Sequence, residues 1–154
     1  MKPGPRLIGE LYAPVDPALL VGIDADCSPG KTFRILPDVA ISLRALRDSA
    51  VAANHKLGIV SAYRTPEHQD KLFANAVAKY GSEEEARKWV AKFSEHATGR
   101  TVDFNLGIQN SSENAAAGKF GELPVWRWLS RNAPLHGWTP YKREPWHWTY
   151  NPQA

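Results

Sequence analysis

The spacing of apolar residues along the chain predicts four helices. Residues 37–55 and 66–80 repeat apolar side chains every three or four positions, and Thr65-Pro66 has the form of an N-cap followed by proline. Gly81 then ends the second helix, residues 82–85 form a capping box for a third, and residues 124–132 predict a fourth. The predicted buried faces are Val39, Leu43, Leu46, Ala50 and Ala53, then Leu72, Phe73, Ala76, Val77 and Tyr80, then Ala86, Trp89, Val90 and Phe93, and last Trp128 and Leu129.

Shorter segments rich in strand-forming residues predict a sheet. These segments are residues 57–63, 101–104 and 146–150. Residues 5–36 are interrupted by proline and glycine, which predicts loops and short extended pieces, and residues 107–121 are polar and predict a loop. We therefore expect an α+β fold with a small central antiparallel sheet flanked by helices. One domain would span residues 1–154, with a loop-rich segment over 1–36 and a catalytic core over 37–150.

The composition agrees with a single globular domain, at 154 residues, 43% hydrophobic and 23% charged. The net charge of +3 mildly favours negatively charged partners such as acidic wall polymers. No lysine and arginine cluster is dense enough to follow a phosphate backbone, so no nucleic-acid partner is expected. No apolar run reaches the roughly 18 residues of a membrane span, and the N-terminus has no secretory pattern. The single cysteine, Cys27, excludes an internal disulfide.

Two segments far apart in the sequence carry the candidate chemistry. The first contains His96 and Asp103, and the second contains Glu144 and His147. Two histidines and one aspartate are a three-ligand set of the kind that catalytic zinc uses, with one position left for water. Structural zinc is usually closed by four ligands, often cysteines, and this chain has only one cysteine. We therefore expect one catalytic Zn²⁺ ion on the sheet, although cobalt or nickel also suit these ligands.

The predicted elements indicate how these ligands could converge. Gly99 and the β-branched residues after it favour a turn that runs into a strand, so that His96 lies on the turn and Asp103 on the strand. On an extended strand, alternation directs Trp146 and Trp148 to one face and His147 to the other. The metal would then lie on the His147 face, with at least one of the two tryptophans on the core side.

Three segments resemble known motifs of one enzyme family. Residues 96–103, His-Ala-Thr-Gly-Arg-Thr-Val-Asp, resemble the H-x-x-G-x-A-x-D element of the VanY-like zinc D-alanyl-D-alanine carboxypeptidases. Residues 144–147, Glu-Pro-Trp-His, resemble the E-x-W-H element, and Ser-Ala-Tyr-Arg at 61–64 resembles S-x-Y-R. The three elements occur in the family's order and span over half of the chain. Thr101 departs from the usual alanine, and it could reshape the pocket or bond to a neighbouring side chain.

The resemblance implies a role for each candidate residue. Glu144 would be the general base that takes a proton from the zinc-bound water and passes it to the departing amine. Arg64 would hold the substrate or the negative charge that develops on the scissile carbonyl, since its guanidinium suits carboxylates and oxyanions. Ser94, Gln69 and Trp146 are the candidate substrate-binding residues. Without the resemblance, Glu144 could be a surface charge and Arg64 a salt-bridge partner at the end of a strand.

The implied substrate is a peptidoglycan stem peptide that ends in D-Ala-D-Ala, with release of the last D-alanine. Similar enzymes of the family remove D-alanine from a tetrapeptide, or cut between L-alanine and D-glutamate as phage endolysins. A zinc-bearing binding domain similar to that of hedgehog proteins is the alternative without catalysis, and the presence of Glu144 argues against it. We expect a monomer. Its location stays open between a phage lysin, a cytoplasmic enzyme and an exported domain.

Overall fold

The computed structural model describes residues 14–24, 32–90 and 94–152. Its main sheet is antiparallel, with four strands in the order β3-β4-β6-β5, and β1 and β2 form a separate two-stranded sheet. The strands are β1 Val21–Asp24, β2 Thr32–Ile35, β3 Gly58–Ser61, β4 Thr101–Asn105, β5 Trp138–Tyr141 and β6 Glu144–Tyr150. The helices are α1 Pro37–Ala52, α2 Pro66–Tyr80, α3 Glu83–Ala86, α4 Ser112–Ala116 and α5 Pro124–Asn132, with 3-10 turns at Pro17–Leu19, Glu95–Thr98, Phe120–Glu122 and Ala133–His136. The predicted α+β class is confirmed.

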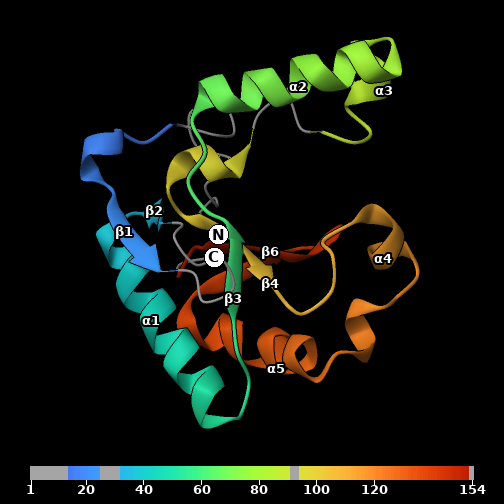
Figure 1. The fold of residues 1–154 in the computed structure, drawn as a ribbon. Coiled ribbons are helices and arrows are strands. Elements are labelled where there is room, and N and C mark those ends of the chain that lie inside the picture. The colour runs from blue at the N-terminus through green and yellow to red at the C-terminus, as the bar shows by residue number, and fades with distance from the viewer. Residues whose placement is uncertain (1–13, 25–31, 91–93, 153–154) are drawn as a thin grey trace.

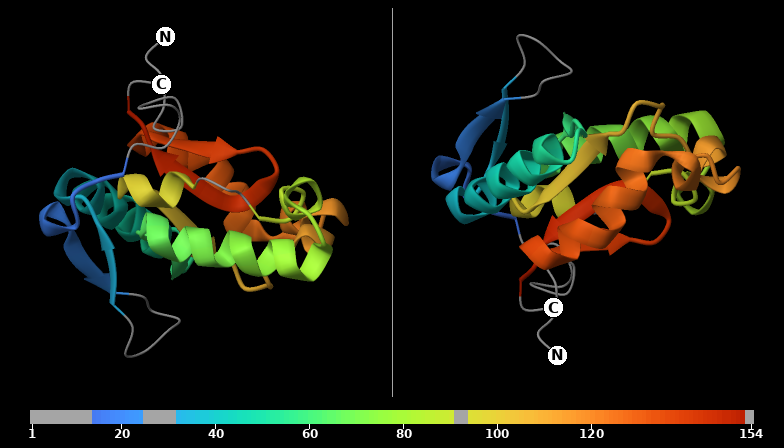
Figure 2. Two further views of the ribbon diagram at one scale, coloured as in Figure 1. Left: turned by 90° about the horizontal axis from the view of Figure 1, so that it is seen from above. Right: turned by 90° about the horizontal axis from the view of Figure 1, so that it is seen from below.

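The hydrophobic core lies between one face of the main sheet and helices α1 and α5. Viewed from opposite sides, α2 is in front of the sheet in one view and α1 and α5 are in front in the other (Figure 2). Buried side chains from both helices and all four strands meet in one cluster, which includes Val39, Leu46, Ile59, Val102, Phe104, Leu129, Trp138 and Trp148. Burial of these apolar side chains away from water is the main force that holds the sheet in place.

Helices α2 and α3 stand on the opposite side of the sheet, at the top of Figure 1. Their own cluster of buried residues is small and consists of Phe73, Ala76 and Ala86. The predicted signals at the ends of α2 are confirmed, because Thr65 accepts a hydrogen bond from the His68 backbone and Gly81 ends the helix at φ 93°. Ser82 likewise accepts a hydrogen bond from the Glu85 backbone at the start of α3.

The predicted third helix is much shorter than expected. It ends at Ala86, and Trp89, predicted to be buried, is 55% exposed and stacks on Tyr80 with ring centroids 5.6 Å apart. Stacking on a neighbouring ring removes apolar surface from water without a place in the core, which the periodicity could not distinguish from burial. Phe93, predicted for the same buried face, lies outside the described residues.

Three other expectations need correction or qualification. The first helix ends at Ala52, so Ala53 is exposed at its C-cap. The predicted loop over 107–121 contains α4, which Ser111 caps by accepting a hydrogen bond from the Asn114 backbone, and a buried Phe120. The N-terminal segment contains the β1–β2 hairpin, consistent with the short extended pieces expected there, while residues 1–13 and the segment with Cys27 lie outside the described residues. No helix in the described part of the chain is long and apolar enough to cross a membrane.

Candidate active site

The register of β4 against β6 places the candidate ligands on one face of the sheet. Asp103 lies directly opposite His147 in this antiparallel pair, and Val102 lies opposite Trp148. Because successive residues of a strand point to opposite faces, the core takes Val102 and Trp148 while Asp103 and His147 face away from it. The predicted alternation is confirmed. Trp146 is also on the core side, where it packs against Phe120 with ring centroids 5.3 Å apart.

His96 approaches this face from the 3-10 turn Glu95–Thr98. Ser94 caps the turn by accepting a hydrogen bond from the His96 backbone, and Gly99 ends it at φ 72°. A side chain at Gly99 would also collide with the N-terminal segment, because a Cβ there would lie 2.9 Å from Leu20 and 3.2 Å from Val15. The backbone N–H groups of Val15 and Leu36 donate to Ala97 and Gly99 in the same segment. The turn is therefore held between the N-terminal segment and the sheet.

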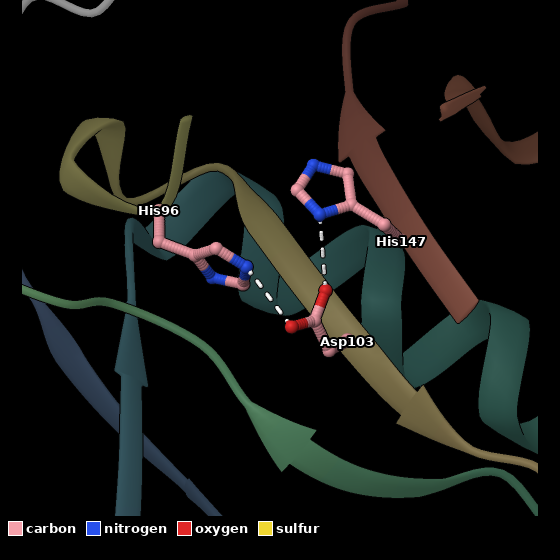
Figure 3. Close-up of side chains that lie close together, drawn as sticks. All are labelled: His96, Asp103 and His147. Carbon is pink, nitrogen blue, oxygen red and sulfur yellow. Dashed lines mark ion pairs between the residues drawn. The ribbon is translucent and has the colours of Figure 1, made fainter. Parts of the chain in front are cut away.

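The three side chains converge on one point, with Asp103 in the middle (Figure 3). His96 Nε2 lies 3.1 Å from Asp103 Oδ2, and His147 Nδ1 lies 3.1 Å from Asp103 Oδ1. One ligand atom from each residue lies within 4.8 Å of the others. His147 Nε2 is buried and makes no hydrogen bond of suitable geometry within the described residues, and the same is true of Asp103 Oδ1 and His147 Nδ1, which lie 3.1 Å apart. A cation bound by both atoms would satisfy them, so the residues fit the predicted metal.

Charge within the cluster shifts the protonation of both partners. Burial raises the pKa of Asp103, but the adjacent histidines outweigh burial and hold this pKa well below its usual range. Burial lowers the pKa of His147, but its contacts with Asp103, Glu144 and Glu95 outweigh burial and raise this pKa well above its usual value. A dense set of carboxylates thus favours positive charge at this point.

His96 is oriented by the backbone. Its Nδ1 lies 2.6 Å from the carbonyl oxygen of Ala62, which can only accept, so Nδ1 carries the hydrogen. Nε2 is then the nitrogen with a free lone pair, and it is the one that faces Asp103. A second hydrogen bond of this kind is typical of metal-binding histidines, because it selects the tautomer and the ring orientation.

Glu144 and Arg64 lie beside the cluster, where the sequence predicted them. The side chain of Glu144 is 40% exposed, and its Oε1 lies 3.4 Å from His147 Nδ1. Arg64 donates to Gln69 Oε1 at 2.9 Å and to Ser61 Oγ at 3.1 Å. Burial lowers the pKa of Arg64, while Asp103 and Glu144 oppose this shift. Arg64 therefore points positive charge toward the cluster and is held there by two side chains.

These residues line a cleft of about 400 Å³ with two walls. The sheet wall consists of His96, Asp103, Glu144 and His147, and the helical wall consists of Arg87, Lys88, Trp89 and Val90, which follow α3. Ser94 and Gln69, predicted to bind substrate, also line the cleft, where Ser94 caps the turn and Gln69 supports Arg64. Trp146 is not among the lining residues and is 8% exposed, so its geometry does not support the predicted contact with substrate.

Sequence reasoning missed several residues that line this cleft, among them Tyr141, whose ring centroid lies 5.4 Å from that of His147, and Glu95. Glu95 lines the cleft, is 8% exposed and places Oε1 3.4 Å from His147 Nε2. Its position between Ser94 and His96 was the only signal in the sequence, because nothing in the local pattern indicates a buried carboxylate. The remaining histidines, His55, His68 and His136, lie outside the cluster.

An open His–Asp–His set beside a carboxylate and an arginine is a candidate site for a catalytic metal ion. Comparison with known proteins identifies the family to which the chain belongs. The chain belongs to the VanY family of D-alanyl-D-alanine carboxypeptidases, whose family description matches residues 32–153. The predicted family is confirmed, and membership indicates a peptidase.

Two curated relatives support the assignment. The chain is 32% identical over 136 residues to a D-alanyl-D-alanine carboxypeptidase of Enterococcus faecalis, with 73% of this chain and 47% of that protein covered. It is 31% identical over 129 residues to the protein YodJ of Bacillus subtilis, with 75% of this chain and 46% of that protein covered. The chain thus spans about half the length of the curated relatives it matches.

Solved structures resemble the chain over most of its length. The LdcB LD-carboxypeptidase superposes with a TM-score of 0.77 at 29% identity, covering 91% of this chain and 72% of that one. VanYB in complex with D-alanine-D-alanine gives 0.63 at 27% identity, covering 93% and 80%. A VanY D,D-pentapeptidase variant in complex with Zn(II) gives 0.60 at 27% identity, covering 85% and 77%.

Proposed function

We propose that this chain is a zinc-dependent carboxypeptidase domain that removes the terminal D-alanine from peptidoglycan stem peptides. The observation that carries the proposal is the buried cluster of His96, Asp103 and His147, with Glu144 and Arg64 beside it in one cleft. When bound, zinc would supply a Lewis acid for the scissile carbonyl and lower the pKa of a water molecule. His96 through Nε2, Asp103 and His147 through Nδ1 would hold the ion.

Glu144 is suited to move the proton of the hydrolysis. It lies at the entrance of the site and is partly exposed, so its carboxylate can reach a water molecule in the cleft. It takes one proton from the attacking water and returns a proton to the amine of the leaving D-alanine as the C–N bond breaks. The products are a shortened peptide with a new carboxylate and free D-alanine.

Arg64 is suited to stabilise negative charge on the substrate. Its hydrogen bonds to Gln69 and Ser61 orient the guanidinium, and its partial burial strengthens its field in the cleft. We assign it to the carbonyl oxygen, which becomes negative during attack, or to the terminal carboxylate of the peptide. The second role favours a substrate with a free C-terminus beside the site.

Two bonds are candidates for cleavage. A D,D-carboxypeptidase acts on a pentapeptide that ends in D-Ala-D-Ala, and the similarity to a D-alanyl-D-alanine carboxypeptidase supports this choice. An L,D-carboxypeptidase acts on the tetrapeptide, and the similarity to the LdcB LD-carboxypeptidase supports this second choice.

Mass spectrometry of zinc-loaded protein incubated with pentapeptide and tetrapeptide muropeptides tests the proposal. Loss of one alanine from the pentapeptide identifies a D,D-carboxypeptidase, and loss from the tetrapeptide identifies an L,D-carboxypeptidase. Fragments from an internal cut would replace the proposal with an endopeptidase of the lysin type. Bound zinc without any cleavage would overturn it in favour of a binding domain. The Glu144→Gln variant is the matched control, because it should leave every substrate intact.

A further inference from the structure

We propose that Glu95 is a positioning residue for His147, and that Thr149 and Thr101 hold the Glu95 carboxylate in place. The inference rests on the metal site of the proposed function and concerns the side of the His147 ring that faces away from Asp103. Glu95 is 8% exposed, which is unusual for a carboxylate. A buried carboxylate is costly unless partners satisfy it, so its contacts indicate what it does.

The His147 ring lies between two carboxylates, with one at each nitrogen. Nδ1 is 3.1 Å from Asp103 Oδ1, and Nε2 is 3.4 Å from Glu95 Oε1. The second contact is longer than an ordinary hydrogen bond and is an ion-pair distance. Glu95 thus favours the tautomer with the hydrogen on Nε2, which leaves the lone pair of Nδ1 for the metal. A carboxylate on the far nitrogen of a histidine ligand is a recurrent way to orient it.

A short chain of hydroxyl groups supports Glu95 from behind. Thr149 Oγ1 donates to Glu95 Oε2 at 3.2 Å, and Thr101 Oγ1 lies 2.8 Å from Thr149 Oγ1. A hydroxyl has one hydrogen, and that of Thr149 is used on the carboxylate, so Thr101 must donate to Thr149. Both threonines are buried, at 0% exposure for Thr101 and 4% for Thr149. Two hydroxyl dipoles therefore point in sequence toward the negative charge, an arrangement in which each bond strengthens the next.

The register of the sheet explains why this chain reaches the metal site. Thr101 lies opposite Thr149, and two residues along each strand Asp103 lies opposite His147. With a period of two, all four side chains share the face away from the core. Thr101 occupies the position where the VanY-like element usually has alanine, which has no hydroxyl. The hydrogen bond from Thr101 to Thr149 therefore requires the hydroxyl that alanine lacks. Of the two expectations for Thr101, this contact agrees with a bond to a neighbouring side chain.

The two histidines differ in how they are oriented. His96 is held by a backbone carbonyl, that of Ala62, which no substitution removes. His147 depends on side chains, so its orientation can be changed by mutation. Removing an outer partner of a metal ligand typically weakens metal binding by about 10- to 100-fold. We expect Glu95→Ala to raise the zinc dissociation constant by this factor, Thr149→Val by less, and Thr101→Val by least.

Competition of the full chain against a chromophoric zinc chelator measures these constants. The visible spectrum of the cobalt-substituted protein reports ligand geometry, and the melting temperature of the metal-free protein reports stability. Glu95→Gln is the conservative variant: its amide oxygen can still face His147 Nε2, and its amide nitrogen can donate to Thr149. We expect Glu95→Gln to bind zinc more tightly than Glu95→Ala and to keep a cobalt spectrum close to that of the parent.

The controls are Glu122→Gln and Thr32→Val, which change exposed residues far from the cluster and should leave zinc binding unchanged. Equal zinc affinity and cobalt spectra in the parent and Glu95→Ala, with only a lower melting temperature, would overturn the proposal in favour of a structural role. If Glu95→Ala fails to fold, the milder Thr149→Val decides by the same comparison. A parent chain that binds no zinc would instead contradict the proposed function, so the two failures are distinguishable.

Discussion

The sheet wall of the cleft packs against the hydrophobic core, whereas the helical wall is supported by only a small cluster of buried residues. Asp103 and His147 lie on adjacent central strands whose other faces carry Val102 and Trp148, at 0% and 2% exposure. The helical wall follows the four-residue helix α3, and the cluster behind it has three buried residues. Its ion pairs, Arg87 with Glu83 and Lys88 with Glu85, join exposed side chains. Such exposed pairs contribute about 0–1 kcal/mol each.

From this difference we expect the two walls to have different functions. Bond cleavage requires groups held within fractions of an ångström, and only burial and hydrogen bonding provide that precision. Choice among substrates tolerates a looser surface, and exposed cationic and aromatic side chains suit it. We therefore expect changes in the sheet wall to alter turnover or metal binding, and changes in the helical wall to alter KM and substrate preference.

Glu144→Gln should give the largest effect. The amide cannot take a proton, so turnover should fall by about 10²- to 10⁴-fold, the usual contribution of a general base. The metal ligands remain, so one zinc ion should still bind. Release of D-alanine measures turnover, and elemental analysis of the dialysed protein measures zinc. Unchanged turnover would remove Glu144 from the mechanism.

Arg64→Met should follow, because Arg64 lies beside the metal-binding cluster and is oriented there by its hydrogen bond to Gln69 in α2. We expect kcat/KM to fall by about 10²- to 10³-fold, as for the loss of one group that stabilises an oxyanion. Arg64→Lys should lose less, because it keeps the charge but not the planar fork that contacts Gln69 and Ser61. Steady-state kinetics of both variants tests this order, and equal losses would show that the positive charge does not act without the planar fork.

The pH dependence of the metal-free and zinc-loaded forms should differ. The raised pKa of His147 stabilises the metal-free fold below about pH 6.5, and this contribution is lost as pH rises through the folded pKa. The lowered pKa of Asp103 stabilises it above about pH 3.9, and this contribution is lost as pH falls toward the folded pKa. The metal-free form should therefore be most stable at roughly pH 4 to 6.5.

Zinc must displace the His147 proton, so zinc affinity should rise with pH by about tenfold per unit while that proton is bound. Melting temperatures measured with zinc and with a chelator test both expectations. A range of about pH 4 to 8 is suitable, because it begins near the ordinary pKa of aspartate and extends past that of histidine. The stabilisation by zinc should grow with pH. A zinc affinity that does not depend on pH would show that no proton leaves the cluster.

Trp89→Ala should give the smallest effect. Trp89 is 55% exposed in the helical wall and contributes one face of an aromatic stack with Tyr80. Its loss should raise KM by roughly two- to tenfold, the equivalent of one aromatic contact, and leave kcat and zinc affinity unchanged. Kinetics on muropeptides and on the free stem peptide would show which part of the substrate it contacts. A fall in kcat alone would contradict the division between the walls.

Much of the candidate site could be predicted from the sequence because its residues occur in short segments of the chain. His96, Asp103, Glu144 and His147 occur in two short segments with characteristic spacing, and the structure brings these segments together in one cluster. Period-two alternation also predicted that Trp146 and Trp148 share the face opposite His147, with at least one of them on the core side, and both are there. The failures concern environment: Trp89 was expected in the core, and Trp146 was expected at the substrate. The periodicity of a segment indicates which residues share a face, but not what that face contacts.

The sequence by itself determined the fold class, the ends of α2, the family and the main candidate residues, because each depends on neighbours a few positions apart along the chain. Only the tertiary structure decided that Glu95 is buried behind His147, that Gln69 supports Arg64, and that Thr101 bonds to Thr149. Thr101 and Thr149 are 48 residues apart and meet through the register of β4 against β6. That register depends on packing of the whole core, which no local pattern encodes.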